Sequence, residues 1–351
     1  MTRQKKRQPA RGRRPRSGDP RRSSGASRVT INQPSDMLGL VPYLLGFRPQ
    51  ESLVFLLIRH NRVLLTARID LPPLIAAEAV VHQFVGLSQQ HDASGLVVLA
   101  YSDDIPAAQE LVSAIAPALA PFGLVDALCV DEERWWSMTC TSDCCPADGT
   151  PYDLSSHPMA AEAVYAGLTA AADRAAIAEQ VTGPPLDDVA GLSDLAREVS
   201  SELGGLSPSR QGDLIATMVL EFVRQPRRLS DAECTRLAVL AGTIAARDVA
   251  WSMISRDEVA AHLQLWQQVV ARAVAPFELA PLCLLGLSAW IAGDGALQNC
   301  CVERALRLDP DYSLAGLLDE INLRALPPSF WDQMADGMSS VVRGGDTPLA
   351  G

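Results

Sequence analysis

One loop of the sequence brings together residue types that bind polar ligands. Residues 46–52 connect a predicted helix to a predicted strand, and two further polar residues stand at the end of the next predicted strand. Guanidinium, carboxylate and hydroxyl groups can hold an anion or move a proton, and loops on a rigid sheet often carry such groups. We therefore predict ligand-binding candidates at Arg48, Glu51, Ser52, Arg68 and Asp70. The alternative interpretation is ordinary loop chemistry with a surface ion pair.

Three thiols lie close together after a tryptophan pair. Cys140, Cys144 and Cys145 fall within six residues, without a C-x-x-C spacing. A structural zinc site needs four ligands, so this group would have to recruit His157 or Cys129. Metal ligation, a redox pair and simple packing of small side chains are the three open interpretations. We favour packing, and we predict neither a metal nor a cofactor.

Local catalytic motifs are missing from the sequence. There is no glycine-rich dinucleotide fingerprint, no nucleophile elbow, no H-E-x-x-H and no EF-hand loop. Lys5 and Lys6 are the only lysines, so the rest of the chain cannot use a lysine Schiff base or a P-loop. His262 stands one turn before Trp266, which predicts a packed helix residue. The sequence predicts no catalytic residue, and the question of enzyme activity stays open.

The elements that would position these residues alternate in type. Apolar runs predict strands at 53–58, 63–69, 95–101, 124–130 and 134–138, and helical spacing predicts helices at 35–45, 74–90 and 106–120. His60-Asn61 suits a hairpin turn between the first two strands. Alternating strands and helices imply βαβ crossovers, so we predict an α/β domain with a mixed sheet.

Beyond Ser156 the pattern is helical. Helix-start signals occur at Ser207, Ser230, Ser255 and Asp309, as one does earlier at Ser35 for the helix at 35–45. An apolar stripe over residues 256–271 consists of Val259, Leu263, Trp266 and Val270. Near the C-terminus a single stretch resembles a degenerate tetratricopeptide repeat, with matches at Leu285, Gly286, Gly293, Ala305 and Pro310. This helical hairpin either offers a groove to a protein partner or serves as scaffold.

Charge divides the chain unevenly. Residues 1–28 contain eleven basic residues and one acid, so their net charge is +10. Because the whole chain carries −11, residues 29–351 carry −21. Such an arm cannot bury apolar surface, and we predict it to be disordered and able to associate with nucleic acid. The predicted organisation is an arm at 1–29, an α/β domain at 30–155, an α-helical domain at 156–335 and a tail at 336–351. No membrane span and no secretory signal are predicted, so we expect a cytoplasmic location.

Five segments together resemble one bacterial family. They are Val41–Val54, Arg68–Pro72, Trp135–Ser137, Cys144–Pro146 with Gly149-Thr150, and Ala292–Ala296. As a set they are similar to the family known as domain of unknown function 4192, over about residues 30–330. The resemblance implies no particular activity, cofactor or catalytic residue.

Three hypotheses for function follow. The leading one is a non-enzymatic intracellular binding or adaptor protein. The second is an enzyme that uses the 46–52 loop with Arg68 and Asp70. The third is nucleic-acid association through the basic arm, since the acidic remainder disfavours a broad nucleic-acid surface.

Overall fold

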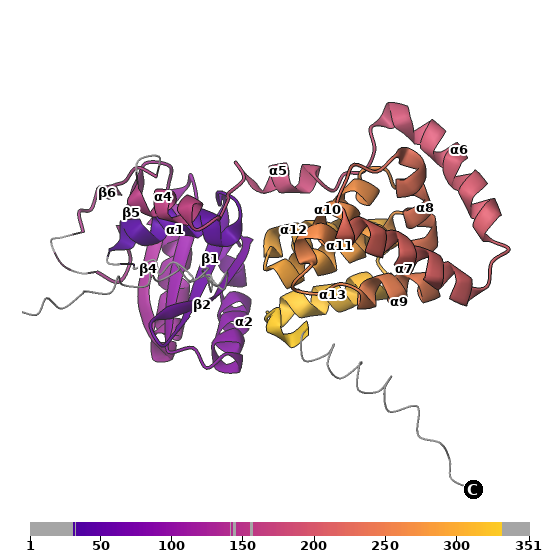
Figure 1. Ribbon diagram of the computed structural model, residues 1–351. Helices are drawn as coiled ribbons and strands as arrows, with labels where there is room; N and C mark the ends of the chain where they lie inside the picture. The colour runs from indigo at the N-terminus through magenta and orange to yellow at the C-terminus, as the bar shows by residue number, and fades with distance from the viewer. Residues whose placement is uncertain (1–30, 32, 141, 143–144, 155–156, 332–351) are drawn as a thin grey trace, which may run out of the picture.

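The protein has an α/β part built on a six-stranded sheet and a separate helical part (Figure 1). The computed structural model describes residues 31, 33–140, 142, 145–154 and 157–331. The predicted fold class, α/β plus α, is confirmed. The elements of the α/β part are α1 (Pro34–Leu45), β1 (Ser52–Arg59), β2 (Arg62–Asp70), η1 (Leu74–Ala76), α2 (Ala77–Gln90), β3 (Gly95–Tyr101), α3 (Ile105–Leu119), η2 (Ala120–Phe122), β4 (Leu124–Val130), β5 (Arg134–Ser137), β6 (Thr150–Pro151) and α4 (Pro158–Tyr165).

The sheet is mixed, as predicted. Its strand order is β2-β1-β3-β4-β5-β6, and the pairing of β3 with β4, across the α3 crossover, is parallel while the other pairings are antiparallel. His60 and Asn61 have φ of 50° and 60°, the left-handed backbone that a two-residue hairpin turn needs. The hairpin places the start of β1 beside the end of β2, where the candidate residues lie.

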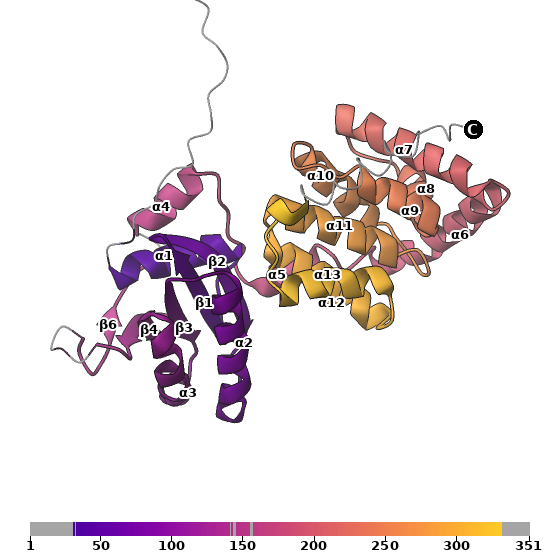
Figure 2. The same ribbon diagram turned by 90° about the horizontal axis from the view of Figure 1, so that it is seen from below.

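Helices cover both faces of the sheet (Figure 2). One face packs on α1 through alternate residues such as Val54, Leu56 and Leu99. The opposite face packs on α2 and α3 through their neighbours, such as Phe55 and Val98. Central strands that are buried on both faces consist of continuous apolar residues. For this reason the strand ranges predicted from the sequence match those in the structure.

The helix α3 is apolar along its length. Within the described residues, Ile105–Phe122 is one stretch that is long and apolar enough to cross a membrane by length and composition alone. The structure packs one face of this helix on the sheet, through Ala108, Leu111, Val112, Ile115 and Leu119. This face of α3 therefore forms part of the core between the sheet and its covering helices.

The helical part surrounds one buried helix, α11. Its elements are α5 (Arg174–Glu179), α6 (Leu186–Leu203), α7 (Pro208–Arg224), α8 (Asp231–Ala241), α9 (Ile244–Ser252), α10 (Val259–Val270), α11 (Leu279–Ala292), α12 (Gly295–Leu308) and α13 (Ser313–Leu323). Every residue of α11 from Ala280 to Ile291 is buried. A side chain at Gly286 would meet the Cβ atom of Cys301 at 3.2 Å, so α11 and α12 approach closely there.

Several predicted helix starts differ from the structure. Helix α1 is capped by Gln33, not Ser35, because Pro34 and Asp36 complete the first turn. Helix α10 begins at Val259 although Ser255 contacts Glu258 as a capping box would. Asp309 ends α12 and lies in a turn, not at the start of a helix. A local capping pattern permits a helix start, while tertiary packing selects the residue.

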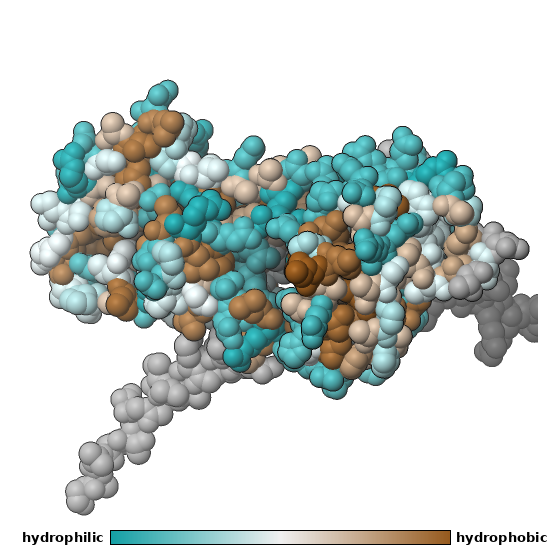
Figure 3. All heavy atoms as spheres, turned by 180° about the vertical axis from the view of Figure 1, so that it is seen from behind, coloured by the Kyte–Doolittle hydropathy of each residue, from teal (hydrophilic) through white to brown (hydrophobic). Residues whose placement is uncertain are grey.

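Two smaller features were not predicted from the sequence. Strand β6 has only two residues, too few for an apolar pattern. The buried face of α10 is centred on His262, Leu265 and Trp266, so Val259 and Leu263 of the predicted stripe lie at its edge. On the rear surface, hydrophobic residues form separate patches on both parts, with hydrophilic residues between them (Figure 3).

Candidate functional site

Four of the five predicted candidates come together at the end of the β1–β2 hairpin. Ser52 pairs with Asp70 in the strand register and is fully buried. The Nε–H of Arg68 donates to the Ser52 hydroxyl at 2.8 Å, and the Arg68 guanidinium forms an ion pair with Asp70 at 2.6 Å. The Ser52 hydroxyl donates in turn to the Gln50 carbonyl. The polar groups of Ser52, Arg68 and Asp70 therefore have hydrogen-bond or ion-pair partners within the hairpin and its preceding loop.

The Glu51 side chain binds the residues that follow the carboxyl end of β3. Its carboxylate accepts a hydrogen bond from the Ser102 hydroxyl at 3.1 Å and from the Asp103 N–H at 2.8 Å. Its backbone has φ of 38°, a left-handed conformation that a non-glycine residue seldom adopts. Ser102 and Asp103 were missed in the sequence, although they directly follow a strand that pairs in parallel, where polar groups collect in α/β folds.

Arg68 also links the hairpin to the helical part. Its guanidinium lies 5.9 Å from the ring centroid of Phe47, and that ring is buried in the core of the helical part. The pKa of Arg174 is raised, chiefly by its hydrogen bond to Glu303 of α12 and to a smaller degree by Asp70. Arg68 therefore contacts a ring of the helical core, and the charge of Asp70 acts weakly on Arg174 across the boundary between the two parts.

Arg48 stands apart from the other candidates. Its side chain is exposed, and its backbone N–H donates to the Ala171 carbonyl at 3.2 Å. Ala171 donates back to the Gly46 carbonyl at 2.8 Å, which makes a short parallel bridge between Phe47 and Ala171. Residues 46–48 therefore join the two parts by their backbone, a role that sequence spacing could not reveal.

A cavity of about 510 Å³ lies next to this joint, and we call it the interface cavity. Its walls come from the end of α1, the chain before α5, α5 itself and the α11–α12 turn. The lining residues are Tyr43, Leu44, Leu45, Gly46, Gly167, Leu168, Thr169, Ala170, Ala171, Ile177, Gln180, Ala292, Gly293, Asp294, Gly295 and Leu297. None of the five candidates predicted from the sequence lines it.

The predicted thiol cluster is only partly described. Cys144 lies outside the described residues, while Cys145 packs with Trp135 against the α1 side of the sheet. His157 caps α4 by accepting from the Met159 N–H, and its Nε2 lies 3.6 Å from an Asp36 carboxylate oxygen. Within the described ranges, no three His, Cys, Asp or Glu side chains are placed to hold a metal ion.

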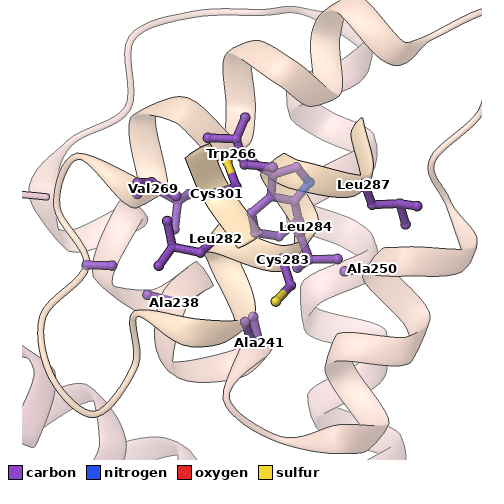
Figure 4. Close-up of a cluster of buried hydrophobic side chains, with 14 of the residues drawn as sticks. Ala238, Ala241, Ala250, Trp266, Val269, Leu282, Cys283, Leu284, Leu287 and Cys301 are labelled. Carbon is purple, nitrogen blue, oxygen red and sulfur yellow. The ribbon is translucent and has the colours of Figure 1, made fainter. Parts of the chain in front are cut away.

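Buried thiols in both parts are held in the protonated form. Burial raises the pKa of Cys129, Cys234 and Cys283 to about 12. Cys283 and Cys301 lie among apolar side chains around Trp266 (Figure 4). Burial also lowers the pKa of His262, which keeps this packed imidazole neutral at physiological pH. A thiolate nucleophile is not available at these positions.

One family comparison covers both parts of the structure. The family described as a domain of unknown function, DUF4192, matches residues 34–329. The chain belongs to this family. The DUF4192 match includes every residue that lines the interface cavity, and the family's own description assigns no function. No curated protein and no solved structure shows significant similarity to this chain.

Proposed function

We propose that this protein binds a small molecule in the interface cavity and that it acts by binding rather than by catalysis. The observation that carries the proposal is a cavity of about 510 Å³ with walls from both parts of the chain. Ligand sites of roughly 300–1,000 Å³ are usual for small molecules, and they favour boundaries between domains. A cytoplasmic location forms part of the proposal.

Binding has better support than catalysis because of what lines the cavity. Its ionisable side chains are those of Tyr43 and Asp294, and one carboxylate oxygen of Asp294 already accepts from the Leu297 N–H at 3.0 Å. The enzyme alternative relies on Glu51, Ser52 and Arg68, whose polar atoms bond to one another and to the end of β3. Side chains whose polar atoms already form hydrogen bonds within the protein favour a structural role over a catalytic one.

A protein-binding groove on the helical hairpin has little support. In a tetratricopeptide array the first helix of each repeat lines the groove, and α11 would be that helix. Because α11 is buried from Ala280 to Ile291, its surface is already used inside the domain. Nucleic-acid association through the arm concerns residues outside the described part of the chain and stays a separate proposal.

Two glycine substitutions test the proposal. A Cβ atom built on Gly295 would meet no atom within 4 Å, and Gly295 lines the cavity, so we expect the ring of Gly295→Phe to occupy the cavity. Gly316→Phe is the matched control, because Gly316 also has open space, lies in α13 and does not line the cavity. Both changes replace a helical glycine, which itself favours the folded state.

The measurement is retention of small molecules by the full chain. Each variant is dialysed against a cell metabolite extract, and the bound compounds are released and identified by mass spectrometry. We expect a compound near one equivalent with the unchanged chain and with Gly316→Phe, and its loss with Gly295→Phe. Retention that survives Gly295→Phe, or no compound above an unrelated control protein, would contradict the proposal.

A further inference from the structure

Two helices end at the interface cavity. Both α1 and α11 stop at a glycine in the left-handed conformation, with φ of 81° at Gly46 and 84° at Gly293, and both glycines line the cavity. The last carbonyls of a helix have no partner within it, and they form the negative end of the helix dipole. The C-terminal ends of both helices therefore lie at the cavity, and at α11 the Trp290 and Ala289 carbonyls already accept from the N–H groups of Gly293 and Asp294.

The carbonyls at the end of α1 also lack donors from the following chain. The N–H that would normally reach the Leu44 carbonyl belongs to Arg48, and it donates to Ala171 instead. The residue whose N–H would normally reach the Leu45 carbonyl is Pro49, and proline has no N–H. Throughout the described residues, no hydrogen bond reaches the carbonyls of Tyr43, Leu44 or Leu45. These oxygens are acceptors for a ligand.

The charges around the cavity have the same sign as these helix ends. Asp294 is the charged side chain among the lining residues, which include no Arg, Lys or His. The positive end of α12 begins at Gly295, and the Asp294 carboxylate that caps it offsets this potential. Residues 29–351 together carry −21, which attracts cations over longer distances.

The lining of the cavity combines polar groups with aliphatic residues that can contact a hydrocarbon group. Leu44, Leu168, Ile177 and Leu297 contribute aliphatic side chains to the same walls. A ligand that fills such a space gains from burying an apolar body while its polar end meets the acceptors. An anion would meet the carboxylate and the carbonyl dipoles unfavourably.

We propose that the occupant of the interface cavity is an organic cation, a small molecule with a protonated amine and an apolar body. The ammonium group donates to the carbonyls at the end of α1 and pairs with Asp294, while the apolar body packs on the leucine and isoleucine side chains. This assignment rests on the proposed function, because it names the ligand class for the same cavity.

A pair of probes of equal size and opposite charge tests the assignment. Binding of 4-phenylbutylamine and of 4-phenylbutyrate to the full chain is measured by ligand-observed NMR and by calorimetry. We expect the amine to bind at least tenfold more tightly than the carboxylate. Asp294→Asn should weaken amine binding by about tenfold, since it removes the charge while asparagine caps a helix as well as aspartate does.

The control variant makes the same change at a distant cap. Asp104→Asn alters the N-cap of α3, whose carboxylate accepts from the Ala107 N–H and which does not line the cavity, so amine binding should stay unchanged. The assignment is overturned if the carboxylate binds as tightly as the amine, if neither probe binds, or if Asp294→Asn has no effect on amine binding.

The Gly295→Phe variant separates the two proposals. Carboxylate binding that Gly295→Phe abolishes would leave the cavity as a ligand site and would refute only the cationic assignment. Amine binding that survives Gly295→Phe would place the amine elsewhere and would refute both. Loss of amine binding in Gly295→Phe and Asp294→Asn, but not in Gly316→Phe or Asp104→Asn, is the result expected.

Discussion

Phe47 is the side chain through which the loop between α1 and β1 enters the helical core. It is 4% exposed, and its backbone bridges to Ala171. Phe47→Ala should lower the free energy of unfolding by about 3–5 kcal/mol, because it leaves a cavity in a packed core. Urea unfolding checks this, with Phe330→Ala as the control, since Phe330 is 36% exposed. Equal losses in the two variants would show that Phe47 adds no special stability.

At the same scale, the sequence predicted where the polar candidates meet but not what they do. Ser52, Arg68 and Asp70 are adjacent because a two-residue hairpin fixes their register, and that turn is visible in the sequence. Their electrostatic influence on the helical part, such as that of Asp70 on the pKa of Arg174, joins residues more than one hundred positions apart in the chain. The interface cavity was missed for the same reason, since its walls are distant in the chain and consist largely of small and aliphatic residues.

Among the elements, strands were located more accurately than helix ends. The bounds of β3 and β4 match the predicted runs because both strands, apart from Asp126 of β4, are apolar between polar or glycine flanks. The helix starts expected at Ser255 and Asp309 were wrong, while those at Ser207 and Ser230 were confirmed. All four sites have capping side chains. A capping side chain alone therefore does not determine where a helix begins.

The cap of α8 gives a pH-dependent prediction. The pKa of Glu233 is lowered to about 2, chiefly by its hydrogen bond from Arg227 and then by the Ser230 backbone N–H. A lowered folded-state pKa means that this stabilisation is complete above about pH 4.5 and is lost as the pH falls toward 2. Glu233→Gln should therefore reduce the free energy of unfolding by about 0.5–1 kcal/mol at pH 7, a modest value because the pair is partly exposed.

Urea titrations between pH 7 and pH 3 measure this effect. The difference between the unchanged chain and Glu233→Gln should shrink below pH 4.5. Glu198→Gln, at an exposed position of α6, is the control variant. A Glu233→Gln difference that stays constant down to pH 3 would argue against a role for the charge.

For the whole molecule, the division of charge predicts the behaviour of the basic arm. Residues 1–28 lie outside the described part of the chain, and their net charge of +10 is opposite to that of the rest. Deleting them should leave the thermal midpoint nearly unchanged and should remove binding to a DNA duplex. In the full chain, that binding should weaken steeply between 50 and 200 mM salt, because phosphate contacts release counterions. A large drop in the midpoint would show that the arm docks on the folded body.

The joint between the two parts also constrains the order in which the chain folds during synthesis. The backbone at Gly46 lies against Ala296 of α12, with 3.9 Å between a Cβ built on the glycine and that of the alanine. A ribosome must therefore make about 250 further residues before the contact of Gly46 with α12 can form. Until then the Phe47 ring has no helical core to enter, and the finished sheet carries an exposed aromatic anchor. Nascent chains with such a surface are the ones that chaperones bind, so the interval before α12 emerges is when this protein is most open to misassembly.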